Sequence, residues 1–213
     1  MLLENERRKI VEYSIKMLEK GLTNETGGNI SILNKELNLF AISPSGRDYL
    51  TTTPEDVVVL DLDGNVVEGK LKPSSEIEMH RLIYVHYKDA SAVVHCHSPY
   101  ATALSILNED LPASNYLVAV GGGNNIRCTT YKSFGSKDIA LEAVKALENR
   151  KACLLANHGQ IGYSNTIESA FSLVSTVEEC SKTYMIARAA GTPKILSDEE
   201  MAFMVEKFVD YRK

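Results

Sequence analysis

Two histidines separated by one residue are the strongest chemical signal in this sequence: His95 and His97 stand in the segment AVVHCHS. The segment is typical of a β-strand, in which side chains at positions i and i+2 point to the same side. Both imidazoles can therefore reach one metal ion, while Cys96 points to the opposite face. A third histidine, His158, stands in an Asn-His-Gly turn expected between two strands. Three protein ligands and one exchangeable position are a common arrangement at catalytic zinc sites.

The histidines also have a simpler interpretation, because many imidazoles in proteins only make hydrogen bonds. An HxH pair or a single histidine is therefore not a metal site by itself. His80 and His86 fall on a helix expected over residues 74–87 and are interpreted as residues of the core edge or the surface. His80 is four residues beyond Glu76 and shares its helical face, so it could support the site without being a ligand.

Three small polar turns accompany the histidines. PSSE at 73–76 places two hydroxyls and the Glu76 carboxylate at a helix N-terminus, where free backbone N–H groups favour an anion. Ser75 followed three residues later by Glu78 is also a plain capping-box pattern. TGGN at 26–29 and SPSG at 43–46 can expose backbone N–H groups in the concave form that binds phosphate, and neither matches a nucleotide-binding P-loop. The sequence thus predicts an anion site beside the metal site.

The remaining chain alternates between helical and extended patterns. We expect one α/β domain over residues 1–213, with a mostly antiparallel central sheet flanked by helices, because the early strands follow one another through short turns. The helices are expected near residues 4–20, 74–87, after Ser98-Pro99, from Ser136 to about 149, 166–190 and 198–210. The strands are expected at residues 29–34, 39–43, 57–62, 65–69, 92–98, 116–120, 126–130, 152–157 and 160–164.

Composition excludes several classes of protein. The net charge of −5 argues against general nucleic-acid binding, which usually needs a basic face. The four cysteines, at 96, 128, 153 and 180, form no CxxC pair, so a zinc knuckle or a thioredoxin-like motif has no support. The charged start lacks the apolar stretch of a signal peptide, and no run reaches the roughly 20 apolar residues of a membrane helix. We expect a cytoplasmic protein with reduced cysteines.

Taken together and in order, these motifs resemble the class II aldolase family, whose members include L-fuculose-1-phosphate aldolase and to which L-ribulose-5-phosphate 4-epimerase is related. The resemblance runs from the first helix to the last. It is carried by GGNIS at 27–31, SPSG at 43–46, PSSE at 73–76, VVHCHSPYATALSIL at 93–107, YLVAVGGGNNIRC at 116–128, SFGS at 133–136 and LLANHGQI at 154–161.

The resemblance implies a role for each matched residue. His95, His97 and His158 would bind one Zn²⁺, and Glu76 would be both a ligand and the catalytic acid/base. The residues that would hold the substrate phosphate are Gly28, Asn29, Ser45, Gly46, Ser74 and Ser75.

The family also suggests a role for several aromatic residues and an assembly. Tyr116 would act across a subunit boundary in a homotetramer with sites between subunits. Phe134 and Tyr211 match aromatic positions near the family's active site. The chain ends two residues after Tyr211, so a tail that closes over the substrate would be short.

The function expected from this resemblance is reversible cleavage of a ketose 1-phosphate, first of all L-fuculose 1-phosphate, into dihydroxyacetone phosphate and L-lactaldehyde. Glu76 would move a proton at the carbon next to the carbonyl, and burial would raise its pKa toward the operating pH. The alternatives are an L-ribulose-5-phosphate 4-epimerase, or an aldolase or dehydratase of methylthioribulose or 5-deoxypentulose phosphates. A non-catalytic module like the adducin head would be expected to lack the histidines and the glutamate, which are present here.

Overall fold

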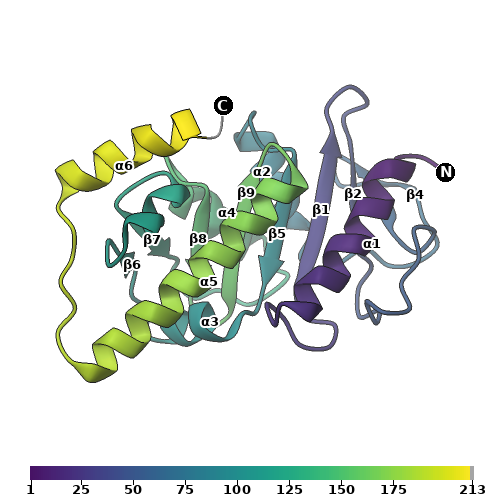
Figure 1. Ribbon diagram of the computed structural model, residues 1–213. Coiled ribbons are helices and arrows are strands. Elements are labelled where there is room, and N and C mark those ends of the chain that lie inside the picture. Colours follow the sequence, from purple (N-terminus) through teal and green to yellow (C-terminus); the bar gives the residue numbers. More distant parts are fainter. Residues whose placement is uncertain (212–213) are drawn as a thin grey trace.

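A nine-stranded sheet forms the centre of the computed structural model, which describes the backbone of residues 1–211 and the side chains of residues 1–208 (Figure 1). The strand order is β4-β3-β2-β1-β5-β9-β8-β7-β6. Within the described chain, β7 and β8 form the one parallel pair. The strands are β1 (Asn29–Asn34), β2 (Leu39–Ile42), β3 (Val58–Asp61), β4 (Val66–Glu68), β5 (Ala92–Cys96), β6 (Leu111–Pro112), β7 (Asn125–Cys128), β8 (Ala152–Leu155) and β9 (Gly159–Ser164).

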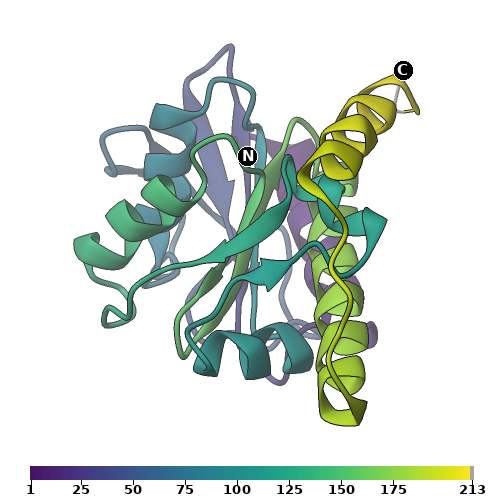
Figure 2. The ribbon, with the colours of Figure 1, turned by 90° about the vertical axis from the view of Figure 1, so that its left-hand side faces the viewer.

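Helices cover both faces of this sheet (Figures 1 and 2). Helices α1 (Glu4–Glu19) and α5 (Ile167–Ala190) pack on one face, while α2 (Ile77–His86) and α4 (Lys137–Ala146) pack together on the other. The helix α3 (Pro99–Ile106), the 3₁₀ helix η1 (Tyr116–Gly121) and the helix α6 (Asp198–Tyr211) contact α5 or η1 at the β6–β8 end. The predicted architecture, a mostly antiparallel sheet flanked by helices, is confirmed.

The alternation of side chains along β5 decides which residues reach the site. Val93 is buried in the core formed by α2 and α4, whereas Ala92, Val94 and Cys96 are buried in the core formed by α1 and α5. His95 has the parity of Val93 and therefore points to the α2 side. Cys96 lies in the opposite core, as predicted.

Three local predictions are corrected by the structure. YLVAV at 116–120 forms a 3₁₀ helix rather than a strand, because the Asn115 side chain accepts a hydrogen bond from the Leu117 N–H and caps it. Ser75 does not cap helix α2, which begins at Ile77; the Ser74 hydroxyl instead accepts a hydrogen bond from the Glu76 N–H. The short strand β6 was not expected.

The other predicted elements are present with shifts of a few residues at their ends. Ser136 caps α4 by accepting a hydrogen bond from the Ile139 N–H, and Pro99 occupies the first turn of α3. Across the described helices, none combines the length and the apolar character needed to span a membrane.

Candidate active site

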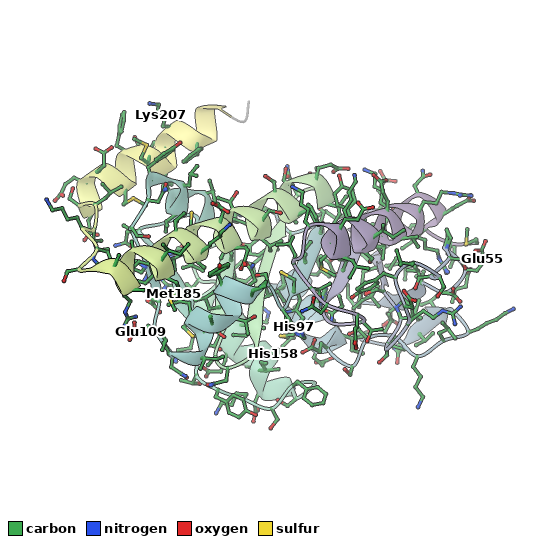
Figure 3. The ribbon with its side chains drawn as sticks, turned by 60° about the horizontal axis from the view of Figure 1, so that its bottom comes forward. Glu55, His97, Glu109, His158, Met185 and Lys207 are labelled. Carbon is green, nitrogen blue, oxygen red and sulfur yellow. The ribbon has the colours of Figure 1, made fainter. Side chains whose placement is uncertain are left out.

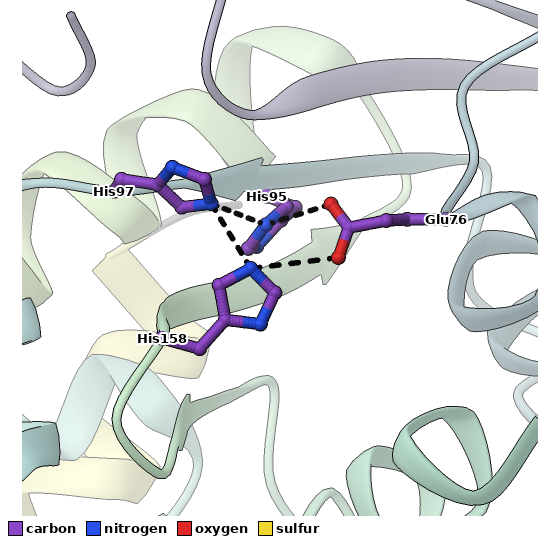
Figure 4. Close-up of side chains that lie close together, drawn as sticks. All are labelled: Glu76, His95, His97 and His158. Carbon is purple, nitrogen blue, oxygen red and sulfur yellow. Dashed lines mark hydrogen bonds and ion pairs between the residues drawn. The ribbon is translucent and has the colours of Figure 1, made fainter. Parts of the chain in front are cut away.

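Four side chains from three parts of the sequence converge at one end of the central strands (Figure 4). The Nε2 atom of His97 lies 3.1 Å from Nε2 of His95 and 3.0 Å from Nε2 of His158. The Glu76 carboxylate completes the group, with Oε2 at 3.1 Å from His95 Nε2 and Oε1 at 3.5 Å from His158 Nε2. All four contributing atoms lie within 4.8 Å of one another, so that one ion could contact all of them.

Strand pairing explains how these residues meet. His95 is the penultimate residue of β5 and His97 follows the strand, while His158 lies in the turn between β8 and β9. Because β5 pairs with β9, this turn is held beside His97. Gly159 permits the approach, since a Cβ atom there would lie 2.5 Å from the Cys96 carbonyl oxygen. Glu76 reaches the same point from the position just before α2.

The donor set fits a cation rather than a hydrogen-bonded cluster. His95 donates its Nδ1–H to the carbonyl oxygen of Gln160, because a carbonyl only accepts. Burial lowers the pKa of His95, but the Glu76 carboxylate beside Nε2 and the Gln160 carbonyl raise it overall, and whenever the ring is neutral Nε2 carries the lone pair. This lone pair faces the nitrogens of two further imidazoles and a carboxylate. In addition, Glu76 Oε1 is buried without a hydrogen-bond partner in the described structure. Buried acceptors that face one another are unfavourable unless a cation lies between them.

The surroundings keep two of the imidazoles neutral. Burial, reinforced by the neighbouring histidines, lowers the pKa of His97 to about 3 and that of His158 to about 4. Burial raises the pKa of the Cys96 thiol to about 12, so that it remains a thiol in the core. For Glu76, burial favours a higher pKa as expected, but the charge and hydrogen bonds of His95, His158 and Asn29 together outweigh burial, and the net direction in this arrangement of side chains is downward. The expected raised pKa of Glu76 is therefore wrong for this state.

A cavity of about 390 Å³ opens directly beside the four groups. It is lined by Glu76, His97 and His158 together with all six residues expected to bind phosphate, namely Gly28, Asn29, Ser45, Gly46, Ser74 and Ser75. Gly28 has φ +76°, and a Cβ atom there would lie 2.6 Å from the His95 carbonyl oxygen, so only glycine fits. The three turns identified in the sequence thus share one cavity with the histidines.

The three aromatic residues that the family resemblance indicated lie at different places relative to the cavity. Phe134 lines the cavity and is 72% exposed. Tyr116 lies in a separate pocket with Met204, Lys207 and Phe208, and its ring stacks on Phe208 with centroids 6.2 Å apart. Figure 3 shows Lys207 well away from His97 and His158, so Tyr116 does not join the cluster within one chain. The side chain of Tyr211 lies outside the described residues.

Sequence reasoning missed the surroundings of the carboxylate. The Asn29 side chain donates from Nδ2 to Glu76 Oε2 at 3.0 Å, and its Oδ1 lies 2.5 Å from Nε2 of His80. Asn29 is the register partner of His95 on the adjacent strand, which a pairing of β1 with β5 would have indicated. His80 is fully buried rather than at the core edge, while His86 is exposed as expected.

Comparisons with known proteins agree with the family resemblance seen in the sequence motifs. Residues 8–185 match the family model described as "Class II Aldolase and Adducin N-terminal domain". The chain is 48% identical to a 5-deoxy-D-ribulose 1-phosphate aldolase of Bacillus thuringiensis serovar kurstaki, covering 99% of each chain. It is 40% identical to the L-fuculose phosphate aldolase of Escherichia coli strain K12, covering 96% of this chain and 94% of the relative.

A solved structure titled L-fuculose 1-phosphate aldolase superposes with a TM-score of 0.95 at 44% identity, covering 98% of both chains. Identity at this level over nearly the whole length extends across every element that builds the site. The chain therefore belongs to the class II aldolase family.

Proposed function

We propose that this protein is a divalent-metal aldolase that cleaves a ketose 1-phosphate into dihydroxyacetone phosphate and a small aldehyde. One observation carries the proposal: the convergence of His95, His97, His158 and Glu76 beside a cavity lined by small polar turns. Imidazole and carboxylate ligands suit Zn²⁺ and several other divalent ions, and we take zinc as the first candidate. When bound there, the ion would act as a Lewis acid on the oxygens beside the bond that breaks.

Glu76 is the residue placed to move a proton. In the cleavage direction, the C4 hydroxyl becomes the aldehyde oxygen and gives its proton to the group that donates it in condensation, which we propose below to be Tyr116 of another subunit. The C3–C4 bond breaks, and its electron pair stays on C3 of the fragment that becomes dihydroxyacetone phosphate. That carbon then takes a proton from the Glu76 carboxyl, and in the condensation direction Glu76 removes it again. Oε1 has no hydrogen-bond partner and lies 3.5 Å from His158 Nε2, whereas Oε2 accepts from Asn29, so Oε1 is the oxygen that we assign to this transfer.

The phosphate supplies binding energy away from the reacting bond. Ser74, Ser75 and the turns at 26–29 and 43–46 face one cavity, and positive φ angles at Gly28 and Gly46 turn the backbone there. Such turns present N–H groups to an anion. A phosphate held in this way would fix the orientation of the carbonyl against Glu76.

The substrate is inferred from the relatives. We favour a 5-deoxypentulose 1-phosphate, which would yield acetaldehyde, because the relative named for such a substrate shares 48% identity. L-Fuculose 1-phosphate, which would yield L-lactaldehyde, is the second candidate, supported by a relative at 40% identity. Both reactions release dihydroxyacetone phosphate, whereas an epimerase or a dehydratase would not.

A second chain would be needed to bring Tyr116 to the reaction. Tyr116 is half exposed, and it lies in a mainly apolar pocket on η1 and α6. We infer a homotetramer in which Tyr116 of one subunit donates its hydroxyl proton to the aldehyde oxygen at another subunit's site during condensation. Sedimentation measures the assembly, and Tyr116→Phe measures the contribution of the hydroxyl.

A panel of sugar phosphates with coupled detection of dihydroxyacetone phosphate tests the proposed function. The metal-loaded protein should release dihydroxyacetone phosphate from 5-deoxy-D-ribulose 1-phosphate, and to a smaller extent from L-fuculose 1-phosphate. Glu76→Gln serves as the negative control. The absence of release from every ketose 1-phosphate would contradict the proposal, and conversion of L-ribulose 5-phosphate to its epimer would favour the epimerase instead.

A further inference from the structure

A row of buried polar groups leads away from the Glu76 carboxylate between helix α2 and strand β1. Glu76, His80 and Tyr84 are spaced by four residues along one helical face, and Asn29 and Ser31 are spaced by two along the facing side of the strand. Four helical residues rise about 6 Å and two strand residues about 6.6 Å, so the two series stay in step. The side chains alternate between the helix and the strand: Glu76, Asn29, His80, Ser31, Tyr84.

Each neighbouring pair in this row is within hydrogen-bond distance. Asn29 Nδ2 lies 3.0 Å from Glu76 Oε2, and Asn29 Oδ1 lies 2.5 Å from His80 Nε2. Ser31 Oγ lies 2.7 Å from His80 Nδ1 and 2.6 Å from the Tyr84 hydroxyl oxygen. All five side chains are buried, so water does not compete for these bonds.

The chemistry of the groups determines which atom donates and which accepts in each hydrogen bond of the row. Glu76 Oε2 accepts, so the Nδ2 end of Asn29 must face it and the Oδ1 end must face His80. His80 must then donate from Nε2, and a neutral imidazole has only that one proton. Its Nδ1 therefore accepts from the Ser31 hydroxyl, whose oxygen in turn accepts from Tyr84. Burial, with His95 nearby, lowers the pKa of His80 to about 3, and burial raises that of Tyr84, in keeping with a neutral imidazole and an intact phenol.

We propose that His80 is a positioning residue for the reaction: by donating to Asn29 Oδ1 it holds the amide whose Nδ2 is hydrogen-bonded to Glu76 Oε2, and so keeps the carboxylate in one position. The inference rests on the proposed function, in which Glu76 moves the proton. The Glu76 carboxylate already selects the Nδ2 end of Asn29, but without the His80 donor the buried Oδ1 would lose its only described hydrogen bond, and the amide would be held at one end alone. The hydrogen bond from Asn29 Nδ2 to Glu76 Oε2 would then be weakened.

Neutron diffraction on metal-free, deuterium-exchanged crystals tests the direction of the row without any catalysis. We expect a deuteron on His80 Nε2, none on His80 Nδ1, and the Ser31 deuteron pointing to the imidazole. A deuteron on His80 Nδ1, or on both ring nitrogens, would overturn the inference, whether or not the protein proves to be an aldolase.

Two substitutions of similar size then separate positioning from packing. In His80→Gln the side-chain amide can replace the Nε2 donor, whereas in His80→Asn it reaches only the place of Nδ1. The readout is exchange of the C3 proton of dihydroxyacetone phosphate with solvent deuterium, which isolates the Glu76 step. We expect His80→Asn to lower the maximal exchange rate about tenfold, the effect of losing one hydrogen bond to a charged group, with little change in KM. His80→Gln should recover most of this loss.

A double-mutant cycle shows whether His80 acts through Asn29. The pair His80→Asn and Asn29→Ala should be no slower than Asn29→Ala alone, because the second change removes the group through which the first one acts. His86→Asn, on the exposed end of the same helix, is the control and should leave exchange unchanged. Equal losses in His80→Asn and His80→Gln, or losses that multiply in the double variant, would overturn the inference. Lack of exchange by the wild-type protein would instead be a failure of the proposed function.

Discussion

Two buried polar clusters share the carboxylate of Glu76, and they differ in how well their hydrogen-bonding groups match. On one side, Asn29, His80, Ser31 and Tyr84 form a row in which each neighbouring pair joins one donor to one acceptor. On the other side, His95, His97 and His158 direct ring nitrogens at one another, and Glu76 Oε1 has no hydrogen-bond partner in the described structure.

This difference distinguishes a cluster that holds side chains in place from a cluster that can bind a ligand. A matched buried cluster is complete by itself, and it stabilises one arrangement of its side chains. An unmatched buried cluster costs free energy until a ligand fills it. Loss of a side chain that faces the ion site, namely His95, His97, His158 or Glu76 (the metal-ligand cluster), should therefore cost much activity but little stability in the metal-free protein. Loss of a group in the matched row should cost more stability and less activity.

Removal of the metal should have the largest effect on aldolase activity. We expect a chelator to abolish aldolase activity, and Zn²⁺ or Co²⁺ to restore it, while the circular dichroism of the folded protein persists because the core does not depend on the ion. The melting temperature should fall on chelation, since a bound ion at 100 times its Kd contributes about 2.7 kcal/mol of stability. Full activity in protein shown by elemental analysis to be metal-free would contradict a metal-dependent reaction at this site.

Glu76→Gln should have the next largest effect. The change keeps the size of the side chain but removes proton transfer, which typically contributes about 10²–10⁴-fold. Exchange of the C3 proton of dihydroxyacetone phosphate should fall at least roughly a hundredfold. Metal content should fall much less, because His95, His97 and His158 remain. Normal exchange in a variant that still holds its metal would show that another residue is the base.

Ser31→Ala tests the matched row by stability. The substitution leaves His80 Nδ1 and the Tyr84 hydroxyl without their partner, and a buried orphaned group costs about 1–3 kcal/mol. Ser75→Ala is the matched control, because Ser75 is exposed and the same change there should stay within about 0.5 kcal/mol. Urea denaturation of the two metal-free variants measures the difference. Equal unfolding free energies would mean that the row does not stabilise the fold.

Ser75→Ala should have the smallest effect and should act on binding. Loss of one hydrogen bond costs about 0.5–1.5 kcal/mol, so KM for dihydroxyacetone phosphate in the exchange reaction should rise about two- to tenfold. Exchange of unphosphorylated dihydroxyacetone should be unaffected, which serves as the control. An unchanged KM for the phosphorylated compound would count against a phosphate contact at Ser75.

The metal-ligand cluster was predictable from local sequence, whereas the matched row was not. The period of two along a strand places His95 and His97 on one side, and a turn between two strands places His158 near a strand end. No local pattern indicates that β1 lies beside β5, and this pairing brings Asn29 to Glu76. Helical spacing predicts that His80 shares the face of Glu76 and could support the site, but not that it is fully buried, because its burial depends on how α2 packs against the sheet.

Apolar content misled the prediction at YLVAV. Valine and tyrosine favour strands, but the Asn115 cap and the left-handed Gly122, with φ +91°, enclose a 3₁₀ helix instead. The consequence for function is large, because Tyr116 then lies on η1, in a pocket apart from the metal-ligand cluster. The role that we propose for Tyr116 therefore requires a second subunit.

Titration with Co²⁺ shows directly whether three imidazoles and one carboxylate bind a divalent ion. Addition of Co²⁺ to metal-free protein should produce a visible d–d spectrum that saturates at one ion per chain, without the near-ultraviolet charge-transfer band of a thiolate ligand. His97→Ala should weaken this binding, and Cys96→Ala should leave the spectrum unchanged. A titration without saturation, or a thiolate band that disappears in Cys96→Ala, would contradict the account.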